Sequence, residues 1–129
     1  MTRFDADADD SRIALVADTV SAHRERGSDF CTLELDPDDG EDELPPWIQI
    51  AGTELNLDVT DAEYERLTTL LDRFPALTVS RTTSPDLAEG TNVRIEARTD
   101  PERIGQFVDR LFVEVYDRPE GYRLWAVEI

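Results

Sequence analysis

The sequence VRIEARTDPERIGQFVDRLFVEVYDRPEGYRLWAVEI, residues 93–129, decides the fold, because three structural signals follow one another within it. Apolar and charged residues alternate over residues 93–98, which is the period-2 pattern of a strand with one face in a core. A helix start follows directly. Thr99 or Asp100 can accept hydrogen bonds from the first-turn amides, and Pro101 suits the first turn because it has no N–H to satisfy.

The predicted helix carries its apolar residues on one face. These residues recur at spacings of three and four positions, and they are Ile104, Phe107, Val108, Leu111, Phe112, Val115 and Tyr116. Pro119 and Gly121 end the helix, and Tyr122–Ile129 follows as a strand with apolar residues in both parities. The pattern predicts a central core helix between two strands.

The remaining sequence predicts one domain behind a short tail. A chain of 129 residues is the size of a single domain. Residues 1–10 carry four Asp and one Phe, which predicts a mobile acidic tail ahead of a domain at 11–129. Apolar periodicity within the domain predicts helices at 11–26 and 60–74, and strands at 30–35, 47–51, 54–59 and from residue 77 onward.

The predicted element order is αβββαββαβ. It predicts an α+β fold with a mostly antiparallel sheet of five to six strands and two or three helices packed mainly on one face. Residues 54–128 alone read βαββαβ, which resembles a ferredoxin-like core with an N-terminal αββ extension. Residues 11–116 read αβββαββα, which is similar to the order in small dimeric secretion-chaperone-like domains. Both are resemblances of element order, so neither implies a function by itself.

The charge balance is strongly acidic. There are 30 acidic residues against 13 basic ones, the formal net charge is −17, and every basic residue is Arg. This composition resembles that of cytoplasmic proteins from salt-accumulating halophilic archaea, and the resemblance implies a halophilic, archaeal protein. Disorder is the competing explanation for such charge. It is excluded for most of the chain, because 40% of residues are hydrophobic and they fall in periodic patterns.

We expect the fold to loosen at low ionic strength, because monovalent cations at high KCl screen the self-repulsion of the net charge of −17. The Debye length falls from about 10 Å at about 0.1 M salt to about 3 Å at about 1 M. Urea unfolding followed by circular dichroism at about 0.1 M and about 2 M KCl measures the effect. Equal stability at the two concentrations would contradict the halophilic interpretation.

Signals for secretion and membrane insertion are missing from the sequence. The N-terminal residues lack the basic and apolar regions of a secretory signal, and no apolar run approaches about 18 residues. The sequence therefore predicts a cytoplasmic protein with no membrane partner. It holds one cysteine, Cys31, and one histidine, His23, which excludes an intramolecular disulfide and a zinc site of Cys and His ligands within one chain.

Catalytic signatures are also missing. The chain contains no GxGxxG, GxxxxGK[ST], HExxH, GxSxG or CxxC motif. His23 continues the apolar stripe of the first predicted helix, and Cys31 lies in an apolar strand, so both are interpreted as structural. The sequence nominates no catalytic residue and no cofactor, and it favours a non-enzymatic protein.

The acidic run Asp36–Glu43, DPDDGEDE, invites a cation-binding interpretation, because clustered carboxylates bind hard divalent ions. It does not fit an EF-hand loop, which has Gly at its sixth position and Glu at its twelfth. Counted from Asp36, Gly40 is in the fifth position and Trp47 in the twelfth. We interpret the run as a solvated loop, and the sequence predicts no metal site.

The outward face of the predicted sheet carries the main functional hypothesis. Strand parity places there Phe30, Trp47, Gln49, Asn56, Arg94, Arg98 and Trp125. Aromatic residues with Arg are typical of the core of a protein interface. The sequence therefore predicts a non-enzymatic interaction or chaperone-like module. It would form a homodimer or bind a protein partner, with Phe30, Trp47 and Trp125 at the interface. The alternative that another part of the same chain covers these aromatic residues stays open.

A second function class is a small-ligand sensor, or a small enzyme, with a pocket between helix and sheet. Arg94, Arg98 and Arg118 would then bind an anion, because guanidinium groups suit carboxylate and phosphate. Aromatic and Arg residues on a sheet also suggest single-stranded RNA. An RNP-type motif is missing, however, and the net charge of −17 opposes phosphate, so the sequence does not favour nucleic acid as a partner.

Overall fold

The structure is a computed structural model that describes residues 4–6, 8–27, 31–35, 47–83, 91–118 and 120–127. Its strands are β1 (Phe4–Ala6), β2 (Cys31–Leu35), β3 (Trp47–Ala51), β4 (Glu54–Val59), β5 (Leu77–Thr83), β6 (Thr91–Ala97) and β7 (Leu124–Val127). Its helices are α1 (Asp9–Arg26), α2 (Asp61–Leu71), α3 (Pro101–Arg110) and the π-helical continuation of α3, η2 (Leu111–Val115).

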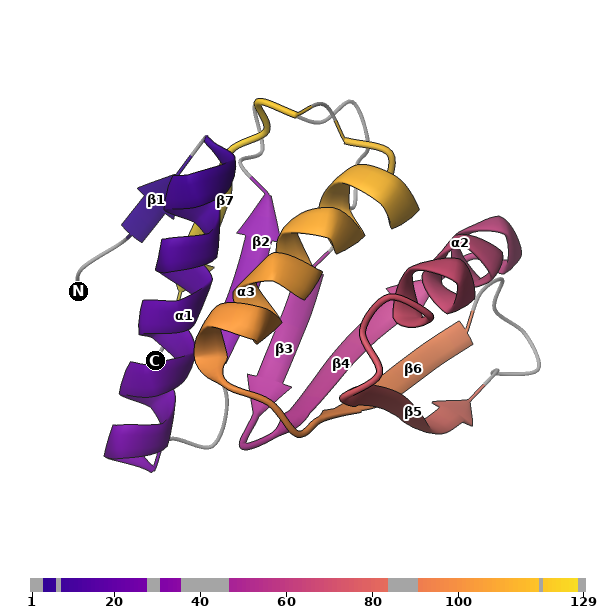
Figure 1. The fold of residues 1–129 in the computed structure, drawn as a ribbon, viewed down its shortest axis with the longest axis horizontal. Helices are drawn as coiled ribbons and strands as arrows, with labels where there is room; N and C mark the ends of the chain where they lie inside the picture. Colours follow the sequence, from indigo (N-terminus) through magenta and orange to yellow (C-terminus); the bar gives the residue numbers. More distant parts are fainter. Residues whose placement is uncertain are drawn as a thin grey trace.

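The strands form one antiparallel sheet in the order β1-β7-β2-β3-β4-β6-β5. Figure 1 shows α1, α3 and α2 side by side on the same side of this sheet. The predicted α+β class, the antiparallel sheet and the helices on one face are confirmed. Within the described residues, the other face of the sheet carries no helix.

The N-terminal residues differ from the predicted tail. Phe4–Ala6 forms β1, which pairs with β7 and brings the number of strands to 7. The side chains of Asp5 and Arg123 form an ion pair across this junction. The apolar content of residues 1–10 gave no sign of a strand, because β1 is held by backbone pairing to residues far along the chain.

The ferredoxin-like alternative for residues 54–128 does not describe this sheet. A split βαβ unit would place its last strand beside its first, which here means β7 beside β4. Instead β7 lies between β1 and β2, and the β2–β3 pair separates it from β4. The hydrophobic pattern predicted β2, β3, β4 and β7, but strand order depends on pairings between distant segments.

The core lies between the sheet and the helices. The strand residues that line it are buried, and they are Cys31, Leu33, Ile48, Ile50, Leu55, Leu57, Val59, Leu77, Val93, Ile95, Ala97, Leu124 and Ala126. Strands β3 and β4 form a hairpin, with Ile48 opposite Leu57. A capping box begins α2, because the side chains of Thr60 and Glu63 each accept a hydrogen bond from the backbone N–H of the other residue.

Helix α1 turns a partly polar face toward the core. Val16 and Val20 are buried, whereas Ile13 and Ala17 are half-buried. Arg12, Thr19 and His23 complete the buried face. The helix ends at Gly27, whose φ of 64° suits the left-handed position that follows a helix.

Helix α3 is the central core helix that the sequence predicts. Asp100 caps it by accepting from the N–H of Arg103 at 2.8 Å, and its last turns widen into η2. The backbone of Gly105 lies so close to α1 that an added Cβ would be 2.6 Å from the carbonyl oxygen of Ile13. Glycine therefore permits the close packing of α1 and α3.

Candidate interaction site on the sheet

The outer face of the sheet is the surface turned away from the three helices. Its central row crosses four strands, because Thr32 pairs with Gln49, Gln49 with Asn56, and Asn56 with Arg94. These side chains are half-buried or exposed, in contrast to the buried residues on either side of them along each strand. Gln49, Asn56 and Arg94 therefore lie on the outer face, as strand parity predicted.

The two tryptophans lie in a second row of the outer face. Asp5 pairs with Trp125, Trp125 pairs with Glu34, and Glu34 pairs with Trp47. Cross-strand partners project from the same face of a sheet, so carboxylates and indoles alternate along this row. We call Asp5, Trp125, Glu34 and Trp47 the tryptophan row. Both indoles are half-buried.

Polar side chains beside the tryptophan row are held by hydrogen bonds within the face. The amide nitrogen of Asn92 donates to Oδ1 of Asn56 at 2.7 Å and to Oδ1 of Asp58 at 2.8 Å. Arg94 lies 3.5 Å from a carboxylate oxygen of Glu54. These contacts join β4 to β6, so the part of the face beyond β3 is organised before any partner binds.

Of the three predicted interface residues, two lie together on the outer face. Trp47 and Trp125 belong to the tryptophan row, and Phe30 lies outside the described residues. Glu34, which alternates with the buried positions Cys31 and Leu33 of β2, was given no functional role from the sequence. Its position between the two tryptophans depends on β2 pairing with both β3 and β7, which no local pattern predicts.

The three arginines predicted to bind an anion are not brought together. Arg94 is on the outer face, whereas Arg98 is 83% exposed beside Glu96, 3.6 Å away. Arg98 precedes α3 and Arg118 follows η2, and these segments of 10 and 5 residues span about 20 Å at about 1.5 Å per residue. The three guanidinium groups therefore cannot share one small ligand.

A buried ion pair that was not predicted from the sequence joins α1 to α3. Nε of Arg12 lies 2.7 Å from Oδ1 of Asp109, and the two side chains are 0% and 2% exposed. The other Arg12 nitrogens donate to the carbonyl oxygens of Tyr122 at 2.9 Å and of Glu120 at 2.7 Å. Asp109 also accepts from the Tyr122 hydroxyl at 3.2 Å and from Arg110 at 2.9 Å. The pair is fully bonded, which indicates a structural role.

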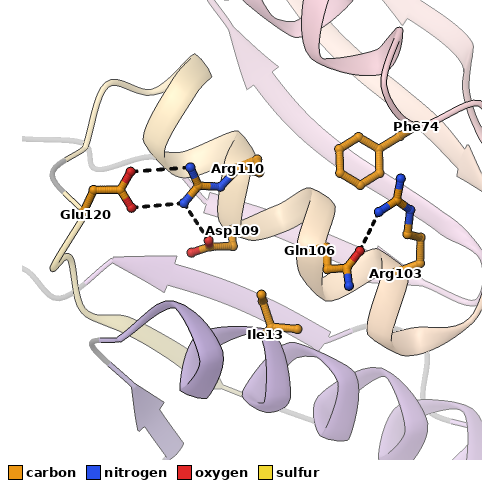
Figure 2. Close-up of a pocket in the computed structure, with 7 residues that line it drawn as sticks. All are labelled: Ile13, Phe74, Arg103, Gln106, Asp109, Arg110 and Glu120. Atoms are coloured by element: carbon orange, nitrogen blue, oxygen red, sulfur yellow. Dashed lines mark hydrogen bonds and ion pairs between the residues drawn. The ribbon is translucent and has the colours of Figure 1, made fainter.

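A groove of about 610 Å³ lies above this pair on the helix side, and Figure 2 shows the seven residues that line it. Arg103 packs over the Phe74 ring at 4.2 Å and donates to Gln106 at 2.6 Å. Arg110 donates to Glu120 at 3.1 Å. Both guanidinium groups in the groove thus already bind groups of the chain itself, which leaves them a structural role.

His23 and Cys31, the two residues weighed as nucleophile or base, are both buried in the core. Nε2 of His23 accepts a hydrogen bond of 2.9 Å from the N–H of Gly52, which fixes the turn between β3 and β4. Burial raises the pKa of Cys31 to about 11, so its thiol stays protonated and inert near neutral pH. Both side chains therefore act as packing groups.

Burial also raises the pKa of Tyr116 and of Tyr122 well above the usual value near 10, and nearby carboxylates add to the effect. The unfolded chain loses these protons at lower pH than the folded chain. Stability is therefore unaffected below about pH 10 and falls above it, by about 1.4 kcal/mol per pH unit for each tyrosine. We expect unfolding in alkali.

The Tyr64→Phe variant tests this expectation, because any tyrosinate absorbance must then come from the two buried tyrosines. Absorbance and circular dichroism are recorded together from pH 8 to pH 12. We expect the tyrosinate signal to appear only as the dichroism is lost. Ionisation of either tyrosine in a chain that keeps its native dichroism would contradict the burial of the two hydroxyl groups.

Among the residues that the structure describes, no group of three or more His, Cys, Asp and Glu side chains is placed to bind a metal ion. The acidic run Asp36–Glu43 lies outside the described residues. No helix in the described ranges is both long enough and apolar enough to cross a membrane.

The fold and its surface define a small α+β protein with three helices on one side of an antiparallel sheet and a row of tryptophans and carboxylates on the other. The chain belongs to the family of unknown function DUF7975, whose model matches residues 1–129. Comparison with curated proteins and with solved structures finds no match.

Proposed function

We propose that the chain is a non-enzymatic interaction module that binds a protein partner through the outer face of its sheet. One observation supports the proposal most. Two half-buried tryptophans flank Glu34 in one cross-strand row, on a face that the three helices leave uncovered among the described residues. Adjacent strands lie about 4.8 Å apart, which puts Trp47 and Trp125 about 10 Å from one another. Tryptophans at such spacing suit a buried centre of an interface.

The chemistry of the tryptophan row indicates what kind of partner it fits. Indole faces attract guanidinium and ammonium groups, and Glu34 between them supplies the opposite charge. On the strands of the wider face, acidic residues outnumber Arg81 and Arg94, and they are Asp5, Glu34, Glu54, Asp58 and Glu96. Three of these five form ion pairs, Asp5 with Arg123, Glu54 with Arg94 and Glu96 with Arg98, so the attraction for a cation rests mainly on Glu34. A partner segment that carries arginine is therefore favoured.

A second copy of the chain on this same face is the less favourable occupant. Face-to-face packing of two copies would bring the carboxylates of the tryptophan row against one another, and like charges across an interface oppose binding. High salt would weaken that repulsion but would not supply an attraction. The acidity of the face therefore favours a different, basic protein.

The anion-sensor alternative has less support. It rests on Arg94, Arg98 and Arg118, and these do not converge, because α3 and η2 separate Arg98 from Arg118. An anion site would have to use other side chains. The groove beside α3 does not readily provide them, because Arg103 and Arg110 bind Gln106 and Glu120 there.

Tryptophan fluorescence tests the proposed chemistry directly. The probe is a short peptide with two arginines, the matched control peptide carries glutamate in their place, and the titration is run at a KCl concentration where the chain is folded. We expect a saturable change with the arginine peptide that is lost in Trp47→Ala and weakened in Glu34→Gln. Tyr64→Ala, which removes a half-buried aromatic residue on the helix side, should bind like the wild type. Equal responses to both peptides would contradict the proposal.

A further inference from the structure

The two edges of the sheet are built differently. At one edge, β1 has 3 residues, and its exposed Asp5 forms an ion pair with Arg123. At the other edge, β5 has 7 residues, and all of them except Leu77 are exposed. Natural sheets protect their edges with short strands and charged residues, because a long free edge invites pairing with another strand. The β1 edge follows this rule, whereas the longer β5 edge has one charged residue, Arg81, and one bulge as its protection.

The β5 edge is also depleted of the charge that dominates the rest of the chain. Residues 73–85, RFPALTVSRTTSP, form the longest stretch without Asp or Glu in a sequence that has 30 acidic residues among 129. The single charged side chain of β5 is Arg81, opposite in sign to the net charge of −17. Two copies of such an acidic protein repel each other least where this segment meets itself.

Backbone groups of β5 point out from the edge. The N–H of Ala97 donates to Thr53 on the β4 side at 2.8 Å, whereas the N–H of Arg98 donates to Ala76 on the β5 side at 3.1 Å. In an antiparallel ladder this direction alternates along the strand, so alternate β5 residues turn their N–H and C=O groups away from β6. The register with β6 makes these residues Leu77, Val79 and Thr82. The N–H of Leu77 already donates to the carbonyl oxygen of Phe74 at 3.0 Å, so Val79 and Thr82 are the residues that offer outward N–H groups.

A bulge lies between Val79 and Arg81, where the register with β6 shifts. The extra residue is Ser80, whose hydroxyl donates to the carbonyl oxygen of Arg94 at 3.1 Å. The bulge is thus hydrogen-bonded toward β6. It does not turn the outward N–H and C=O groups of β5 away from the edge. Val79 beside it is 36% exposed, and it is the exposed large hydrophobic residue among those described.

We infer that β5 pairs antiparallel with β5 of a second copy, so that one sheet continues across a two-fold symmetric dimer. A strand paired with its own copy around a two-fold axis is self-complementary, as such an interface requires. The pairing bonds the outward N–H and C=O groups and covers Val79. It uses the edge of the sheet, so the tryptophan row stays available to a partner in each copy.

Light scattering after size exclusion at molar KCl tests this inference on five proteins: the wild type, Thr82→Glu, Thr82→Pro, Thr69→Glu and Trp47→Ala. Thr82→Glu puts a carboxylate at the edge, and Thr82→Pro removes an outward N–H. Thr69→Glu makes the same charge change at an exposed position of α2. Circular dichroism checks that each variant is folded. If Thr82→Pro does not fold, the result is decided by Thr82→Glu.

We expect the wild type, Thr69→Glu and Trp47→Ala to be dimers. Each Thr82 variant should raise the dimer dissociation constant about tenfold or more, because both copies lose an edge interaction. A wild-type monomer at the highest concentration tested would overturn the inference, as would a folded Thr82→Glu variant that dimerises like the wild type. A dimer lost in Trp47→Ala and kept in Thr82→Glu would overturn it too, and would assign self-association to the outer face.

Discussion

Asp109→Ala is expected to lower the free energy of unfolding by about 3–5 kcal/mol, the range found when one partner of a buried ion pair is removed. The reason is the guanidinium of Arg12, which is 0% exposed and loses its carboxylate partner at 2.7 Å. The Tyr122 hydroxyl loses its acceptor on Asp109 as well. A buried charge without its partner has neither water nor a counter-ion to stabilise it. Urea unfolding in molar KCl measures the loss.

Glu114→Ala is the matched control, because it removes one carboxylate from ion pairs near the surface. Glu114 is 38% exposed and pairs with Arg73, which is 54% exposed, so its loss should change stability by less than about 1 kcal/mol. A double variant, Arg12→Met with Asp109→Leu, should recover most of the stability that Asp109→Ala loses, since it leaves no buried charge. Equal, small effects of Asp109→Ala and Glu114→Ala would contradict the structural role of the buried pair.

Gly105→Ala is expected to destabilise the chain by about 1–3 kcal/mol, although alanine favours a helix over glycine by about 1 kcal/mol. The added Cβ would lie 2.6 Å from the backbone carbonyl oxygen of Ile13. A backbone atom cannot move aside as a side chain can, so α1 and α3 must separate. Trimming the neighbouring side chain in an Ile13→Ala background should therefore not relieve the effect.

Gly121→Ala is the control for this substitution, because an added Cβ there meets nothing within 4 Å. We expect Gly121→Ala to leave the free energy of unfolding nearly unchanged, and the same urea measurement compares the two variants. If Gly105→Ala stabilised the chain, helix propensity would outweigh the contact. The close approach of α1 and α3 would then be absent in solution.

Local patterns predicted much of the fold. The bounds of β3 and β4 and the capping box at Thr60 and Glu63 follow from alternation and spacing within a few residues. The cap of α3 by Asp100 follows in the same way. Such features are fixed by neighbours in the sequence, which is why single-sequence reasoning finds them.

Features that depend on distant partners were not predicted. Arg12 and Asp109 form their pair across 97 positions, and each looked like a surface residue because charged residues are normally solvated. Arg12 does fit the spacing of four that links it to Val16 and Val20, so helical periodicity alone could have placed it on the buried face. Strand β1 was not predicted for the same reason, because it is held by pairing with the distant strand β7.

The candidate site was predicted in part. Parity put Trp47 and Trp125 on one face, since alternate residues of a strand share a side. Parity could not show that they are two strands apart, because this depends on the order β7-β2-β3. That order inserts Glu34 between the indoles and gives the tryptophan row its preference for a cation. The sequence thus predicted the residues of the face and missed their arrangement.

The most direct test of the outer face as an interaction surface is hydrogen exchange on the captured complex. The wild type, Trp47→Ala and Tyr64→Ala are immobilised at molar KCl, and the proteins that each retains from a cell extract are compared. Hydrogen exchange of the chain is then measured with and without the retained proteins. We predict proteins retained by the wild type and Tyr64→Ala but not by Trp47→Ala, with protection confined to β2, β3 and β7. Retention that survives Trp47→Ala, or protection that falls on α1, α2 and α3 instead, would contradict the account.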